Sequence, residues 1–115
     1  MTGQPFIIKM YSMKTFAFKM KLLPGKEEEY RKRHDAIWPE LVQLLQETGV
    51  SEYHIYLDET SHTLFAFQKL HGEANSQQLG DHPVVQQWWA MMADICETNP
   101  DNSPVTLPLV KMFEL

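Results

Sequence analysis

Apolar and polar side chains alternate strictly from Lys14 to Lys21, so one side of this segment is apolar and the other is polar. A period of two residues predicts a half-buried β-strand. Residues 50–58 and 63–70, rich in aromatic and β-branched side chains, predict two further strands joined by a polar hairpin connection. A last strand is expected from about Val105 to Phe113, at a sheet edge or with a bulge because Pro108 lies within it.

Apolar residues spaced three and four apart predict helices in two longer segments. The first begins at Lys26 and stops at Gly49. Pro39 is expected to kink or break it near residues 35–38, because proline has no N–H and its ring crowds an earlier carbonyl. The second helix is expected from Pro83 to about Cys96, and a short helix within residues 72–80.

The order strand, helix, strand, strand, helix, strand predicts an α+β, ferredoxin-like βαββαβ fold with both helical segments on one face of an antiparallel sheet. Phe16 and Phe18, with Phe65 and Phe67, supply apolar groups for both faces. The face without helices is therefore expected to meet a second subunit, which gives a homodimer. The expected domains are an N-terminal extension over residues 1–12 and a single domain over residues 13–115.

Composition narrows the classes of function. Ten basic and fifteen acidic residues give a net charge of −5, which argues against a nucleic-acid binder. No apolar stretch is long enough for a membrane span, and no secretory signal is recognisable. The single cysteine, Cys96, cannot form an internal disulfide, so a cytoplasmic protein is expected. The scattered glycines and histidines match neither a phosphate-binding loop nor a zinc site, so no metal is expected.

Tyr30 and His34 are the first candidate pair for chemistry. Four residues apart on a helix, they lie on one face, and histidine is the side chain best suited to proton transfer near neutral pH. The spacing alone favours a structural role, in which Tyr30 packs in the core and His34 caps a carbonyl.

Trp88 and Trp89 are the second candidate pair. Adjacent helical residues point about 100° apart, so one indole can pack inward while the other lines a cavity or an interface. An exposed indole face suits the C–H face of a sugar, but simple core packing stays equally open. Tyr53 and Tyr56 lie on opposite faces of one strand, so at most one faces the helices, and a tyrosine in a strand is usually structural.

Five segments of the chain form a distinctive set: EYRKRH at 29–34, IWPEL at 37–41, YHIYLD at 53–58, the tryptophan pair at 88–89 and NPDNSP at 99–104. In this order and spacing they resemble the L-rhamnose mutarotase family. The resemblance covers almost everything from Met13 to the C-terminus. It implies a homodimeric α/β barrel without metal or organic cofactor that interconverts the α and β anomers of L-rhamnose in rhamnose catabolism.

The resemblance also implies roles for individual residues. His34 matches the family's catalytic histidine and is expected to donate a proton to the ring oxygen of the sugar. Tyr30, Tyr53, Trp88 and Trp89 match the family's sugar-binding positions.

Two alternatives share the expected fold. One is a haem-degrading or quinol-type monooxygenase of the same dimeric barrel, and the other is a sugar-binding dimer without catalysis. Fold analogy does not separate them from a mutarotase, whereas the residue match favours the mutarotase.

Overall fold

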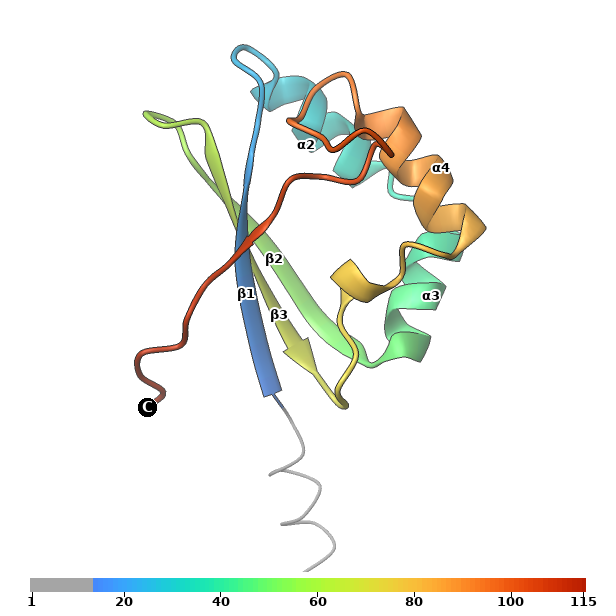
Figure 1. Ribbon diagram of the computed structural model, residues 1–115, viewed down its shortest axis with the longest axis vertical. Coiled ribbons are helices and arrows are strands. Elements are labelled where there is room, and N and C mark those ends of the chain that lie inside the picture. Colours follow the sequence, from blue (N-terminus) through green and yellow to red (C-terminus); the bar gives the residue numbers. More distant parts are fainter. Residues whose placement is uncertain (1–13) are drawn as a thin grey trace, which may run out of the picture.

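A four-stranded antiparallel sheet with helices on one face makes up the computed structural model, which describes residues 14–115 (Figure 1). The strands lie in the order β2-β3-β1-β4. Their bounds are Lys14–Lys21 for β1, Val50–Asp58 for β2, Thr63–Leu70 for β3 and Leu107–Pro108 for β4. The α+β fold class is confirmed, and the expected extension at residues 1–12 lies outside the described residues.

The helices confirm the expected break at Pro39. They are α2 (Glu27–Asp35), α3 (Pro39–Thr48), α4 (Pro83–Met92) and the single 3₁₀ turn η1 (Ser76–Gln78). Trp38, directly before the proline, has extended backbone angles of φ −67° and ψ 133°, as sterics before proline require. Gly49 ends α3 in the left-handed conformation at φ +111°, and its N–H donates to the carbonyl of Gln46.

The last helix is shorter than the pattern predicts. The expectation that it reaches Cys96 is wrong, because α4 ends at Met92. The chain beyond it turns back to pair with the end of β1: Leu23 N–H donates to the Ile95 carbonyl, and Cys96 forms an antiparallel bridge with Leu22. These long-range backbone hydrogen bonds replace the ones that a longer helix would have made. The short helix expected within residues 72–80 is present as the 3₁₀ helix η1.

The last strand is also shorter than expected, with two residues in place of 105–113. It lies at the sheet edge beside β1, as expected from Pro108, which has no N–H to donate to the sheet. One further bond, from Leu109 N–H to the Ala17 carbonyl, follows before the chain leaves the sheet.

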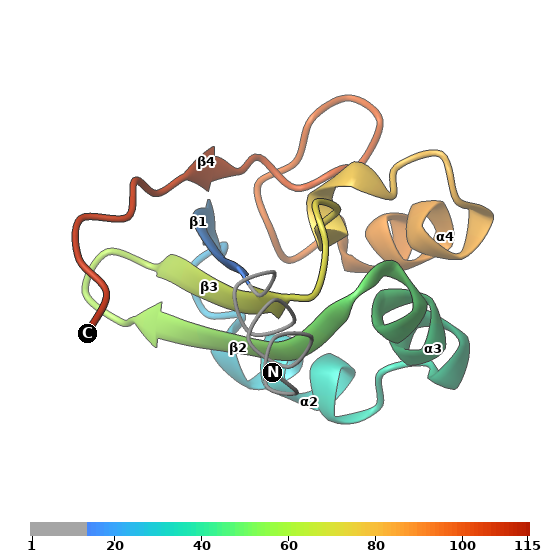
Figure 2. The same cartoon turned by 90° about the horizontal axis from the view of Figure 1, so that it is seen from below.

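The sheet face under the helices carries the hydrophobic core. Phe18 of β1 lies opposite Ala66 of β3, and both are almost fully buried, as are Leu64 and Ile95. Figure 2 shows that α3 and α4 lie on the same side of the sheet. Burial of these apolar side chains is the main stabilising contribution to the fold.

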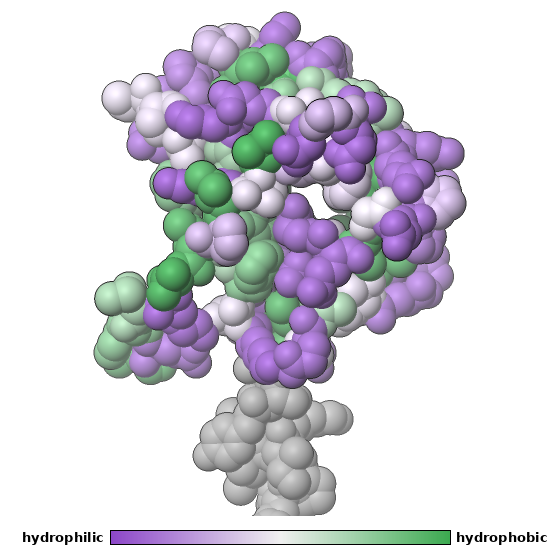
Figure 3. All heavy atoms as spheres, viewed as in Figure 1, coloured by the Kyte–Doolittle hydropathy of each residue, from purple (hydrophilic) through white to green (hydrophobic). Residues whose placement is uncertain are grey.

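The opposite sheet face is uncovered. Tyr56 and Phe67 are 64% and 43% exposed there, and their rings contact each other with centroids 6.0 Å apart. Apolar side chains also project from the C-terminal segment, where Leu107 and Val110 are exposed. In Figure 3 apolar atoms gather along this segment, away from the helices. None of the helices in residues 14–115 is long and apolar enough to cross a lipid bilayer.

Candidate functional site

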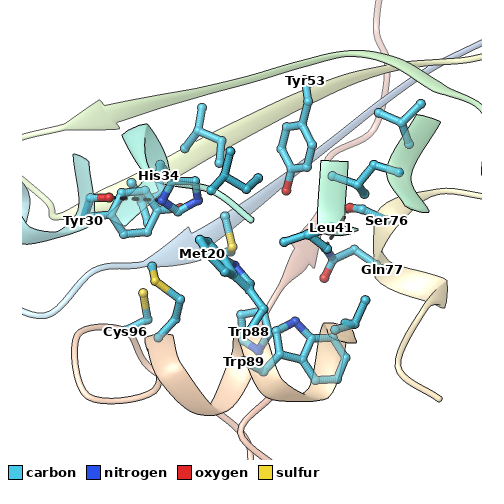
Figure 4. A pocket seen from close by; sticks show the side chains of 18 of the residues that line it. Met20, Tyr30, His34, Leu41, Tyr53, Ser76, Gln77, Trp88, Trp89 and Cys96 are labelled. Atoms are coloured by element: carbon cyan, nitrogen blue, oxygen red, sulfur yellow. Dashed lines mark hydrogen bonds between the residues drawn. The ribbon is translucent and has the colours of Figure 1, made fainter. Parts of the chain in front are cut away.

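A cavity of about 640 Å³ lies between the sheet and the helices. Strands β1, β2 and β3, all three α-helices and the turn η1 contribute to its walls, and Figure 4 shows it from close by. The five residues selected from the sequence all line this one cavity; they are Tyr30, His34, Tyr53, Trp88 and Trp89. Side chains from α2, β2 and α4, up to about half the chain apart, therefore meet at a single site.

Helix α2 places His34 directly against Tyr30. The imidazole stacks on the phenol ring with centroids 4.3 Å apart and an angle of 26° between the planes. Its Nδ1 lies 3.1 Å from the backbone carbonyl oxygen of Tyr30. A carbonyl oxygen only accepts hydrogen bonds, so Nδ1 carries the proton and the neutral ring has an unprotonated Nε2. The expected contact between His34 and a carbonyl is thus present, and it leaves the second nitrogen available for chemistry.

Burial keeps this imidazole neutral at physiological pH. Removal from water lowers the pKa of His34, while the hydrogen bond to the Tyr30 carbonyl and the charge of Asp35 act in the opposite direction. The net pKa lies below the usual histidine value of about 6.5. The ring is therefore ready to accept a proton through Nε2 before it donates one.

The structure shows which tryptophan packs in the core and which lines the cavity, a question that the sequence left open. Trp88 is 9% exposed, and its indole packs edge-on against the His34 ring at 5.4 Å and against Trp38 at 5.2 Å. Trp89 is only half-buried and stands beside Trp88 at the cavity wall (Figure 4). Trp88 is consequently both a core residue and a wall of the cavity, and Trp89 belongs mainly to the wall.

Tyr53 is the tyrosine of β2 that faces the helices, and Tyr56 faces away, as strand alternation requires. Burial raises the pKa of the Tyr53 hydroxyl, and hydrogen bonding with Ser76 and Gln68 opposes this rise. Burial also raises the pKa of Tyr30 well above its usual value. Both phenols remain protonated at neutral pH and can donate hydrogen bonds.

Three polar residues of the cavity region escaped the sequence reasoning: Gln68, Ser76 and Gln77. Gln68 is 2% exposed and interrupts an otherwise apolar row that includes Leu64 and Ala66 on β3. A polar residue at an inward-facing strand position is unusual, so the sequence alone could have marked Gln68 as a candidate site residue. Ser76 and Gln77 come from the turn η1, where the sequence carries no comparable signal.

Cys96 also lines the cavity. Burial raises the pKa of its thiol to about 11, so it stays protonated and unreactive at neutral pH. Within residues 14–115, His, Cys, Asp and Glu side chains form no group of three or more that could hold a metal ion.

A model of the L-rhamnose mutarotase family matches residues 15–115. The chain belongs to this family. An L-rhamnose mutarotase of Bacteroides thetaiotaomicron is 59% identical over 103 residues, which cover 90% of this chain and 99% of the relative. The crystal structure of an L-rhamnose mutarotase from Formosa agariphila superposes with a TM-score of 0.83 at 51% identity, covering 89% of this chain and 98% of the other. The chain is accordingly an isomerase of the L-rhamnose mutarotase family.

A more distant likeness concerns the fold alone. The crystal structure described as a putative antibiotic biosynthesis monooxygenase from a Bacteroides species superposes with a TM-score of 0.54 at 10% identity. It covers 88% of this chain and 90% of its own. The mutarotase family thus shares its α+β architecture with proteins of other described activities.

Proposed function

We propose that this chain interconverts the α and β anomers of L-rhamnose, with His34 as the residue that moves the proton. The observation that carries the proposal is the position of a neutral imidazole, held in one tautomer, inside a cavity walled by two indoles. The cavity volume lies within the range of small-molecule sites, roughly 300–1,000 Å³. The match to the mutarotase family identifies the sugar.

Anomer exchange requires the pyranose ring to open and close. The anomeric O–H loses its proton, the ring oxygen gains one, and the bond between C1 and the ring oxygen breaks to give the open aldehyde. Rotation about C1–C2 and reclosure then give the other anomer. The two oxygens that exchange protons are attached to the same carbon, so a single imidazole nitrogen can serve both in turn.

His34 is suited to this sequence of steps. Nε2 of the neutral ring accepts the proton of the anomeric hydroxyl, and the resulting imidazolium donates a proton to the ring oxygen as the C1–O bond breaks. This second step is the proton donation expected for His34 from its family resemblance. The Tyr30 carbonyl stabilises the imidazolium, because it accepts a hydrogen bond from Nδ1 in both protonation states. General acid–base catalysis of this kind contributes about 10²–10⁴-fold to a rate.

The other four residues bind the sugar in this proposal. Trp88 and Trp89 cover its apolar C–H face and the C6 methyl group. Tyr30 and Tyr53 donate hydrogen bonds to its oxygen atoms, since their raised pKa values keep both hydroxyls protonated.

Saturation-transfer NMR on the anomeric protons of L-rhamnose tests the proposal. The wild-type chain is expected to accelerate exchange, and His34→Ala is expected to lose about 10²–10⁴-fold of that acceleration. His71→Ala is the matched control, because His71 is an exposed histidine outside the cavity. Full acceleration by His34→Ala would refute the role of His34. Binding of L-rhamnose without acceleration by the wild type would instead indicate a sugar-binding protein without catalysis.

We further propose that the chain forms a homodimer through the uncovered sheet face. The exposed rings of Tyr56 and Phe67, together with the apolar C-terminal segment, provide the apolar surface that a second copy would bury. Phe67→Glu is expected to give monomers in sedimentation velocity, and Gln87→Glu, an exposed site on α4, is expected to leave the dimer intact. A monomeric wild type would contradict this assembly.

The proposed cellular compartment is the cytoplasm, where sugar catabolism takes place. The buried, unpaired thiol of Cys96 needs no oxidising environment. Fractionation of cells with an antibody against the protein tests this, and recovery from a secreted fraction would contradict it.

A further inference from the structure

A polar cluster lines one wall of the cavity, apart from His34. It consists of Tyr53, Ser76 and Gln77, which line the cavity, and of Gln68, which forms hydrogen bonds with Ser76 from the sheet. Figure 4 shows His34 and the pair Ser76 and Gln77 on opposite sides of the cavity. Gln68 on β3 is directly opposite Tyr53 on β2 in the sheet register. The sheet therefore fixes the backbone positions of two members of the cluster.

The turn η1 is fastened to the sheet by two hydrogen bonds between one pair of residues. The amide nitrogen of Gln68 donates to the hydroxyl oxygen of Ser76, and the backbone N–H of Ser76 donates to the amide oxygen of Gln68 at 3.3 Å. Gln68 and Ser76 are 2% and 8% exposed, so water competes little for these bonds. The amide oxygen of Gln68 and one of its N–H groups are thereby used in holding the turn in place.

Gln77, the next residue along the turn, is fixed from both its backbone and its side chain. Its backbone N–H donates to the side-chain oxygen of Asn75 at 2.9 Å, and its Nε2 donates to the hydroxyl oxygen of Ser76 at 3.1 Å. A primary amide has two N–H groups and one oxygen. Among the described residues, the second N–H and the amide oxygen of Gln77 make no further hydrogen bond. One donor and one acceptor therefore remain on a side chain that lines the cavity.

The position of this amide indicates which part of a sugar it would meet. Under the proposed function, on which this inference rests, His34 must reach the anomeric oxygen and the ring oxygen. The edge of the pyranose remote from both oxygens carries the hydroxyls at C3 and C4. A sugar with its ring oxygen toward His34 presents these two neighbouring hydroxyls to the opposite wall, where Gln77 lies.

We infer that Gln77 is a specificity-determining residue that binds the C3 and C4 hydroxyls of the sugar with its free N–H and its amide oxygen. Two adjacent hydroxyls offer one acceptor and one donor, which is the complement of what the amide has left. The bonds through Gln68, Ser76 and Asn75 hold the amide in position before the sugar arrives, which lowers the entropy cost of binding.

Gln77→Met tests the inference, because methionine has nearly the same length and removes only the polar atoms. Wild type and variant are compared on L-rhamnose, 3-deoxy-L-rhamnose and 4-deoxy-L-rhamnose by anomer-exchange NMR. We expect the wild type to prefer L-rhamnose by about tenfold in kcat/KM over at least one deoxy sugar. The variant is expected to lose about tenfold on L-rhamnose, mainly through KM, and to treat that deoxy sugar and L-rhamnose alike.

Gln87→Met is the control, since Gln87 is exposed on α4 outside the cavity. Unchanged discrimination by Gln77→Met, with an unchanged melting temperature, would overturn the inference. If the wild type accelerates no exchange, the proposed function fails, and the same comparison is made on dissociation constants from calorimetry. Equal loss of affinity for all three sugars in the variant would then overturn the role of Gln77.

Discussion

The Nδ1 atom of His34 lies 3.1 Å from the backbone carbonyl oxygen of Tyr30, while the imidazole ring stacks on the phenol of the same residue. One tyrosine therefore fixes both the orientation and the tautomer of the histidine. Because the contact joins residues i and i+4 of α2, it forms as soon as the helix does. The unprotonated Nε2 is a consequence of helix geometry together with burial.

The activity is expected to depend on pH in one direction only between about pH 5 and pH 9. The neutral imidazole of His34 is the active form, so kcat/KM falls as pH decreases through the pKa of His34, which lies below about 6.5. No decrease is expected on the alkaline side, because the pKa values of Tyr30 and Tyr53 are raised above 10. Exchange rates corrected for the buffer-catalysed reaction measure this profile. A loss of activity between pH 7 and pH 9 would contradict it.

The free energy of unfolding is also expected to depend on the protonation of His34. A lowered pKa in the folded state means that the unfolded chain binds more protons, so the free energy of unfolding rises with pH between the folded-state pKa and about 6.5. As pH falls through this window, that contribution is lost. Urea denaturation of the wild type and His34→Gln at several pH values measures the difference, and identical pH dependence of the two proteins would show that His34 makes no contribution.

Substitution of Trp88 is expected to affect mainly the stability of the fold, and substitution of Trp89 mainly the binding of the sugar. Trp88→Ala removes a buried indole that packs on His34 and Trp38, so it is expected to lower the free energy of unfolding by about 3–5 kcal/mol. Trp89→Ala removes a half-buried ring, so a smaller loss of stability and a larger KM are expected. Denaturant unfolding and exchange kinetics on both variants make the comparison. Equal destabilisation by the two substitutions would contradict this division.

Gly80→Ala is expected to disturb the cavity through Trp89. A Cβ at position 80 would lie 3.1 Å from the Trp89 ring, closer than ordinary van der Waals contact, so the indole must move by a few tenths of an ångström. We expect a few-fold higher KM for L-rhamnose and a changed tryptophan fluorescence. Gly72→Ala is the control, because a Cβ there meets no atom within 4 Å. Unchanged kinetics in Gly80→Ala would show that the position of Trp89 tolerates this shift.

Gly49→Ala is expected to destabilise the fold without changing the chemistry of the site. Gly49 has φ +111°, a conformation that costs an L-residue about 1–2 kcal/mol. It ends α3 immediately before β2, the strand that carries Tyr53. Chemical denaturation is expected to show a loss of about this size against Gly72→Ala, with kcat near the wild-type value. A variant as stable as the wild type would refute the strain argument.

Local sequence rules predicted the first three strands and the helix break closely. Strict alternation over Lys14–Lys21 and the β-rich segments 50–58 and 63–70 gave the bounds that the structure has. Pro39 located the break because the loss of its N–H and the clash of its ring act within one helical turn. These effects depend only on neighbouring residues, which is why no tertiary information was needed.

The two elements that the sequence misjudged are decided by distant partners. The segment after Met92 has a helical apolar pattern, yet its backbone pairs with the end of β1. Residues 105–113 resemble a full strand, yet only Leu107 and Pro108 pair in register with β1. In both cases a backbone hydrogen-bond partner far along the chain competes with the local conformational preference. The local sequence pattern does not indicate which distant segment provides that partner.

The amino-acid sequence by itself determined the order of the elements, the placement of Tyr53 and Tyr56 on opposite faces of one strand, and the pairing of Tyr30 with His34, because each follows from helical or strand periodicity. Only the tertiary structure decided that His34 is buried enough to be neutral, that Trp88 packs on it, and that Gln68 fastens Ser76 beside Gln77. These properties arise from water exclusion and from contacts between separate elements, which exist only once the sheet and helices have packed together.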